Sequence, residues 1–338
     1  MQEQAIIRAL RRHLTRSPSQ ENQAFTADAE IISDRGQHQA FTIDDFSAED
    51  CLPFADGESL GWNLVAATIS DLLAAGAKPE MMMNSLVAAP WMDETYLHSL
   101  SRGIQAALDE CGAFMIGGDV GSAGDWRFTG VAIGSYCEGV KAISRQTSEV
   151  SGNIMATGLY GDGNLGALGN WPVRFEIRQN ESLALAKTDD SYQVACIDTS
   201  DGLWSALSTL ADQNSDLRLL VNLTSIPYAP YTKNIAIEMD IPPESFLVGS
   251  AGEYELVCLA PAAECQRLES AGWYRIGLFS LEGEPGLYYR LSESAPSCRR
   301  CDPLPDPRDA ESIASYKESL VAYARRHFTD MGDRHDVE

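Results

Sequence analysis

Five short segments of the chain place aspartates beside glycine or other small residues, at the ends of apolar runs or at the starts of helix-like ones. These segments contain Asp28, Asp44, Asp71, Asp119, and the pair Asp198 and Asp201. Carboxylate oxygens brought together from several strand ends are the ligands that hard cations such as Mg²⁺ require. Two like charges about 4 Å apart repel by about 1 kcal/mol in water and about 4 kcal/mol at an effective dielectric near 20, and a cation between them reverses the sign. The first prediction is therefore an enzyme that binds a nucleotide through Mg²⁺.

Two of these segments have a competing structural interpretation. Asp71 interrupts an apolar helical pattern, where a polar side chain satisfied within the core is the alternative to a metal ligand. Burying an unpaired carboxylate is costly, which favours the metal. Asp198, Ser200 and Asp201 precede another predicted helix, and capping that helix accounts for one of the three. Capping does not require all three, so we predict that they bind metal or phosphate.

A glycine-rich loop carries a third signal. Gly161, Gly163 and Gly166 have the spacing of a dinucleotide-binding loop and follow a predicted strand. Asp162, however, would face the pyrophosphate, and Pro172 limits the helix that should follow. We therefore expect a flexible loop near phosphate or substrate, with NAD binding as the alternative. The five histidines lie in no motif, which argues against a Ser-His-Asp triad.

Composition places the chain among globular proteins of the cytoplasm. Its 338 residues, 44% of them hydrophobic, suggest two domains. The formal net charge of −24 argues against nucleic acids and anionic membranes as partners. The chain has no apolar run of the ~18 residues that a membrane span requires, and its N-terminus lacks the pattern of a secretory signal. Eight cysteines without a secreted framework fit reduced thiols, and we expect Cys298 and Cys301 to be ordinary loop cysteines.

The periodicity of apolar residues predicts the elements that must position the aspartates. Predicted strands span residues 29–33, 39–43, 82–89, 114–116, 128–137, 153–157, 193–197, 218–221 and 255–260. Predicted helices span residues 3–15, 60–75, 93–111, 183–187, 203–213 and 311–328. This alternation indicates an α/β or α+β fold. We expect an N-terminal domain at residues 1–140, a C-terminal domain at 141–300, and a linker with a terminal helix at 301–338.

Four motifs make the interpretation more specific. They are ISDLLAAGAKP at residues 69–79, IGGD at 116–119, DTSDGL at 198–203 and YEL at 254–256. In this order and spacing they resemble thiamine-monophosphate kinase, a relative of aminoimidazole ribonucleotide synthetase, selenophosphate synthetase and the hydrogenase-maturation dehydratase. The resemblance covers roughly residues 25–260. It implies a two-domain PurM-like fold, a homodimer whose N-terminal domains build a barrel-like core, and ATP held by several Mg²⁺ ions.

The resemblance also implies roles for individual residues. The metal ligands that it implies are Asp28, Thr42, Asp44, Asp71, Asp119, Asp198 and Asp201. The implied nucleotide contacts are Arg145 and Ser200, with Gly117, Gly118, Gly161 and Asp162 in loops beside the phosphates. We assign the catalytic role to Asp198 and Asp201, and contacts with the acceptor substrate to Cys51 and Glu253.

The acceptor side departs from the family pattern. The family's substrate histidine falls on Cys51 and its substrate glutamate on Gly252, while its late aromatic residue has no counterpart between residues 303 and 310. We therefore expect an ATP- and Mg²⁺-dependent phosphotransferase with a changed small-molecule acceptor. One alternative is an ATP-dependent synthetase of the aminoimidazole ribonucleotide synthetase type. Another is a non-catalytic regulator that binds ATP.

Overall fold

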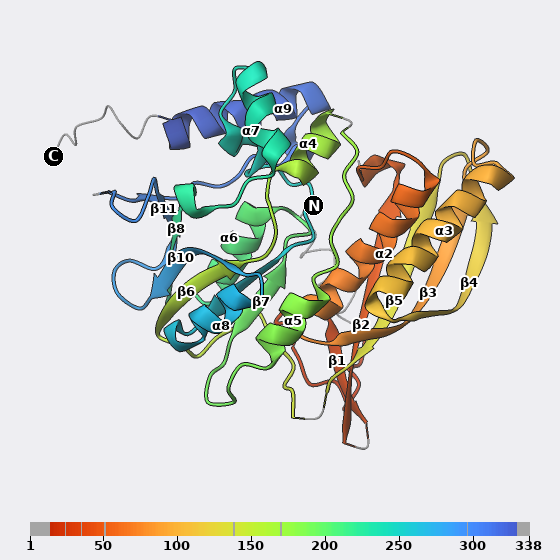
Figure 1. The fold of residues 1–338 in the computed structure, drawn as a ribbon, viewed down its shortest axis with the longest axis horizontal. Coiled ribbons are helices and arrows are strands. Elements are labelled where there is room, and N and C mark those ends of the chain that lie inside the picture. The colour runs from red at the N-terminus through yellow and green to blue at the C-terminus, as the bar shows by residue number, and fades with distance from the viewer. Residues whose placement is uncertain are drawn as a thin grey trace.

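The computed structural model describes residues 14–329, except residues 24, 35, 51, 138, 170 and 296. Two α/β halves lie side by side, each built on its own sheet (Figure 1). We refer to residues 14–135 as the N-terminal half and to residues 151–329 as the C-terminal half. The predicted boundary at residues 140–141 falls in the segment that connects them. The helix predicted at residues 3–15 lies largely outside the described residues.

The N-terminal half contains a five-stranded sheet in the order β1-β2-β5-β3-β4. Its strands are β1 (Glu30–Asp34), β2 (Gln37–Ser47), β3 (Lys78–Ala88), β4 (Phe114–Ser122) and β5 (Arg127–Ser135). Its helices are α2 (Gly57–Ala74) and α3 (Glu94–Cys111). Only the β3–β4 pair is parallel among the described pairs of this sheet.

Helices α2 and α3 cross closely on one face of this sheet. A side chain at Gly61 would place its Cβ 2.1 Å from the carbonyl oxygen of Leu100, and one at Gly103 would approach Glu58 to 1.9 Å. These two glycines therefore allow the two backbones to touch. Helix α3 is capped at both ends, because Asp93 accepts a hydrogen bond from the backbone N–H of Tyr96 and Gly112 has a left-handed φ of 70°.

The opposite face of the sheet carries exposed apolar side chains, among them Ile43 and Met83. The edge strand β4 adds Phe114 to this face, and Ile116 and Val120 are also exposed on β4, with Val120 on the helix-covered side of the edge. Among the described strands the sheet is open, with β1 and β4 at its edges, so the single chain shows no closed barrel. The barrel-like core remains a prediction about the dimer.

The C-terminal half contains a seven-stranded sheet in the order β12-β11-β8-β10-β6-β9-β7. Its strands are β6 (Ser151–Ala156), β7 (Ala195–Asp198), β8 (Arg218–Asn222), β9 (Leu256–Ala260), β10 (Tyr274–Ser280), β11 (Gly286–Arg290) and β12 (Arg299–Arg300). Its helices are α4 (Asp162–Gly169), α5 (Gln179–Ala186), α6 (Leu203–Gln213), α7 (Pro230–Glu238), α8 (Cys265–Ser270) and α9 (Ile313–Ala324). Together the two halves confirm the predicted mixed α/β class.

Helix α2 joins the halves. It is buried along nearly its whole length and contacts β7, β9 and α5 as well as its own sheet (Figure 1). Trp62 Nε1 donates to the carbonyl oxygen of Phe175 at 2.7 Å, and Asn63 Nδ2 donates to that of Val173 at 2.8 Å. These bonds hold an extended segment of the C-terminal half along α2. Within the described residues, no helix is both long and apolar enough to cross a membrane.

Candidate metal and phosphate site

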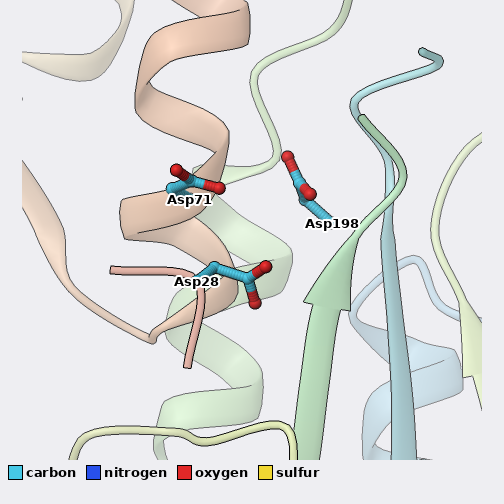
Figure 2. A group of neighbouring side chains, drawn as sticks. All are labelled: Asp28, Asp71 and Asp198. Carbon is cyan, nitrogen blue, oxygen red and sulfur yellow. The ribbon is translucent and has the colours of Figure 1, made fainter. Parts of the chain in front are cut away.

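Three carboxylates converge where the halves meet. Asp28 precedes β1, Asp71 lies near the end of α2, and Asp198 ends β7. One oxygen of each lies within 4.8 Å of the others, and Figure 2 shows the three side chains turned toward a common centre. No other group of three potential metal ligands among His, Cys, Asp and Glu forms within the described ranges. Three of the residues predicted as metal ligands therefore lie together, whereas Cys298 and Cys301 belong to no such group among the described residues.

The electrostatics of this cluster are those of buried like charges. Burial raises the pKa of Asp28 to about 7, an effect that the Arg145 guanidinium opposes and the Asp198 charge reinforces. Burial, followed by the charges of Asp198 and Asp28, also raises the pKa of Asp44 to about 7. The pKa of Asp71 lies well above its usual value, again chiefly because of burial. Without a cation, these carboxyls are protonated at far higher pH than carboxyls in water.

Hydroxyl and guanidinium groups hold the carboxylates in place. Arg145 pairs with Asp28 Oδ1, with its Nε at 3.1 Å. Thr42 Oγ1 donates to Asp71 Oδ2 at 2.5 Å, and Asp71 therefore has a protein donor on one oxygen. Asp28 Oδ2 is buried and has no hydrogen-bond partner among the described residues. A buried, unpartnered carboxylate oxygen is rare in folded proteins.

This arrangement fits a divalent cation. Asp28 has an unpartnered buried oxygen, and the neighbouring Asp71 and Asp198 also offer only oxygen. An all-oxygen donor set suits Mg²⁺, and a cation would relieve the repulsion among the charges. The interpretation of Asp71 as a side chain satisfied only within the core is therefore less consistent with the site.

The turn after β7 shows which residues cap α6. The N-cap position is Gly202, which has no side chain and no side-chain capping bond. Ser200 Oγ instead donates to Asp198 Oδ1 at 2.9 Å. None of Asp198, Ser200 and Asp201 occupies the N-cap position, so the expectation that one of them caps this helix is wrong.

Asp119 lies elsewhere in the single chain. It is exposed on β4, where it lies opposite Ser85 of β3 in the strand register. Across the next two strands, the residues in line with Ser85 are Thr129 of β5 and then Asp45 of β2. Paired residues share a face of the sheet, and Asp45 points away from its neighbour Asp44. Asp119 therefore lies on the open face of the N-terminal sheet, as does Gly117, while Gly118 shares the row of Asp44.

The glycine-rich loop binds a carboxylate of the protein itself. The backbone N–H groups of Gly161 and Gly163 donate to Glu253 at 2.7 and 3.1 Å. Burial raises the pKa of Glu253 to about 8, although these two hydrogen bonds act in the opposite direction. Asp162 accepts a bond from Thr232 Oγ1 at 3.1 Å. Two amides that the loop would offer to a pyrophosphate are thus already used, which argues against the dinucleotide interpretation.

A cavity of about 430 Å³ opens beside Asp201. Its walls come from Asp50, Ser205, the loop at residues 248–250 and the segment at residues 304–308. Sequence reasoning assigned that last segment to a linker, because no local pattern reveals its distant contacts. Cys51 lies outside the described residues.

Tyr254 is a second feature that sequence reasoning missed. Its φ of 53° is left-handed, which is uncommon for a residue with a side chain. Its ring lies 4.6 Å from that of Phe175, and a Cβ at Gly252 would lie 2.7 Å from the ring. The space that a side chain at position 252 would need is therefore occupied by the Ser200 carbonyl oxygen and the Tyr254 ring. Burial raises the pKa of Tyr254 well above its usual range, and the nearby charges of Asp44 and Asp198 add to the shift.

Comparisons with known proteins agree with the motifs. Residues 26–136 match the model of the family described as AIR synthase related protein, N-terminal domain. Thiamine-monophosphate kinase of Synechococcus elongatus is 26% identical over 255 residues, which are 70% of this chain and 76% of the relative. The chain thus contains an AIR synthase related N-terminal domain and is similar to thiamine-monophosphate kinases over about 70% of its length.

Solved structures show the same fold for this kinase-like chain. The structure of AaThiL complexed with AMPPCP and TMP has a TM-score of 0.73 at 17% identity and covers 89% of this chain and 95% of that one. Escherichia coli HypE, a hydrogenase maturation protein, has a TM-score of 0.66 at 16% identity, with coverages of 91% and 99%. The predicted mixed α/β class is therefore shared with these solved structures over most of the chain.

Proposed function

We propose that the chain is an ATP- and Mg²⁺-dependent phosphotransferase of the thiamine-monophosphate kinase type, acting on a small-molecule acceptor. The observation that carries this proposal is the convergence of Asp28, Asp71 and Asp198, one of which, Asp28, has a buried oxygen without a hydrogen-bond partner among the described residues. The relatives named thiamine-monophosphate kinase support the reaction class. The complex of AaThiL with AMPPCP, an ATP analogue, and TMP supports ATP as donor and a phosphorylated small molecule as acceptor.

The residues of the chain have separable tasks in this reaction. A Mg²⁺ ion bound here would neutralise charge that develops on the transferred phosphoryl group. Asp28, Asp71 and Asp198 would hold it, with Asp44 beside them. Arg145 orients Asp28 and Ser200 orients Asp198. We assign nucleotide contacts to the same Arg145 and Ser200.

The acceptor would lie in the cavity beside Asp201. That cavity is lined by carboxylates, hydroxyls, Arg308 and the Leu304–Pro305 corner, and none of its lining residues is aromatic. Asp306 holds Arg308, whose Nε donates to Asp306 Oδ1 at 2.9 Å and whose Nη2 donates to Asp306 Oδ2 at 2.8 Å. Asp201, which lines the cavity, would orient the acceptor oxygen. We propose that this different lining, together with Gly252, has changed the acceptor from thiamine monophosphate.

We also propose a homodimer formed through the open face and edge of the N-terminal sheet. Ile43, Phe114 and Val120 are 66%, 71% and 75% exposed, an unusual density of bare apolar side chains on one sheet. Asp119 on the same strand would then become part of the interface, close to a second copy of the chain. A sedimentation experiment tests this, since a dimer should dissociate when Val120 and Phe114 are both replaced by Lys.

Product analysis tests the reaction. With ATP, Mg²⁺ and a panel of phosphorylated alcohols, the proposal predicts ADP and a newly phosphorylated acceptor. Asp71→Asn should abolish both products, while Asp109→Asn, on the exposed face of α3, should leave them unchanged. Formation of ADP with a ligated or dehydrated product would instead support the synthetase alternative. Binding of ATP without any product from the panel would favour the regulator.

A further inference from the structure

Ser70 makes an unusual hydrogen bond for a serine inside a helix. It lies in the interior of α2, immediately before Asp71, and is 2% exposed. Serine and threonine at such positions commonly donate to the carbonyl oxygen four residues earlier. Thr68 does so, donating to Leu64 at 2.8 Å. The Ser70 hydroxyl instead leaves its own helix and donates to Asp198 Oδ2 in the C-terminal half.

This bond completes the support of Asp198. Its other oxygen accepts from Ser200, which belongs to the same turn as Asp198 and therefore moves with it. Ser70 belongs to the helix that carries Asp71. Of these two hydroxyls, only that of Ser70 fixes the position of Asp198 relative to a carboxylate of the N-terminal half.

We propose that Ser70 is a positioning residue of the metal centre, which orients Asp198 against Asp71 and thereby sets the affinity for the cation. This inference rests on the proposed function, because it requires a divalent cation in the carboxylate cluster. Groups that hydrogen-bond to metal ligands fix the orientation of those ligands, and their loss typically lowers metal affinity or activity by about 10- to 100-fold. Ser70 matches that description for a ligand contributed by the other half.

The chain contains a matched control for a purely structural role. Ser182 is 1% exposed, lies on α5, and donates its hydroxyl to the carbonyl oxygen of Leu73 on α2 at 2.6 Å. It thus joins the same helix to the same half of the protein. Its partner is a backbone carbonyl, however, and not a carboxylate of the cluster. Loss of this hydroxyl should weaken the contact between the halves without releasing a metal ligand.

Mn²⁺ is a suitable probe because its binding can be measured by electron paramagnetic resonance without nucleotide or turnover. We expect Ser70→Ala to raise the Kd for Mn²⁺ by about 10-fold or more. We expect Ser182→Ala to keep the Kd within about twofold of the parent, although both substitutions remove one buried hydroxyl. Urea unfolding in EDTA should show similar losses of stability for the two variants.

The outcomes separate this inference from the function on which it rests. If the parent protein binds no Mn²⁺, the proposed metal-dependent function is itself refuted. A parent that binds, with Ser70→Ala binding equally well, would show that Ser70 does not position Asp198. Equal weakening in Ser182→Ala would show that the effect is a general loosening between the halves, and would also overturn the inference. If Ser70→Ala does not fold, Ser70→Cys decides, since it keeps the shape with a much weaker donor; an unchanged Kd would again refute the proposal.

Discussion

Asp44→Asn should stabilise the protein when no cation is present. The pKa of Asp44 is about 7 in the fold against 3.8 for an unperturbed carboxyl, because burial and the charges of Asp198 and Asp28 disfavour its ionised form. A folded-state pKa above the unfolded one means that stability present below about pH 4 is lost as pH rises toward 7. At about 1.4 kcal/mol per pKa unit, the loss by pH 8 is on the order of a few kcal/mol. Asparagine has similar volume and no charge, so it escapes this loss.

Urea unfolding in EDTA, measured from pH 5 to pH 8.5, tests this expectation. The free energy of unfolding of Asp44→Asn should exceed that of the parent at pH 8, and the difference should shrink toward pH 5. With Mg²⁺ present the order should reverse, because the parent then gains binding energy that the variant lacks.

Asp45→Asn is the control, because Asp45 is the next residue on β2 and faces the open side of the sheet, beside Thr129 and Arg127. It should show neither the gain in EDTA nor the reversal. An Asp44→Asn protein that is no more stable than the parent in EDTA at pH 8 would refute the reasoning about buried like charges.

Three further expectations follow from the site. ATP with Mg²⁺ should stabilise the fold by about 2.7 kcal/mol at a hundredfold excess over Kd, whereas ATP with EDTA should do much less; equal melting temperatures in the two conditions would contradict the metal bridge. Thiamine monophosphate should be phosphorylated with kcat/KM well below about 10⁴ M⁻¹s⁻¹ in an assay for thiamine diphosphate, and ordinary turnover would show that the acceptor has not changed. Gly252→Ala should destabilise the fold by about 1–3 kcal/mol in urea unfolding, since its Cβ would lie 2.6 Å from the Ser200 carbonyl oxygen and 2.7 Å from the Tyr254 ring; an unchanged midpoint would mean that both neighbours give way without cost.

The long elements and the neighbouring aspartates could be predicted from the sequence for the same physical reason. Local patterns mark both, since a helical apolar period identifies α2 and short acidic motifs mark the ends of elements. The boundaries were less exact: α2 begins at Gly57 and not at residue 60, because Asp56 and Ser59 form a capping box. Strand β2 continues to Ser47, four residues beyond its prediction.

What local patterns do not encode is the arrangement of distant segments. Helices α7 and α8 and strands β10 to β12 were not predicted, and most of these are short elements fixed by packing. The face occupied by Asp119 follows from strand register, which depends on pairing partners far away in the sequence. The Ser70 bond spans 128 residues. The hydrogen bonds from the glycine loop to Glu253 also cannot be predicted from a sequence motif, although Gly161 and Glu253 were each predicted as site residues.

The burial of α2 has a consequence for how the molecule can be divided. Residues 26–136 match a family model of an N-terminal domain by themselves. We do not expect them to fold stably as a separate fragment, because removing the C-terminal half would expose the side of α2 that contacts β7, β9 and α5. Fragments cut at residue 140 should therefore be poorly soluble when made separately and should recover when produced together. Chimeras that combine halves from two relatives should meet the same obstacle, since the C-terminal half of one relative would have to fit the exposed side of α2 in the other.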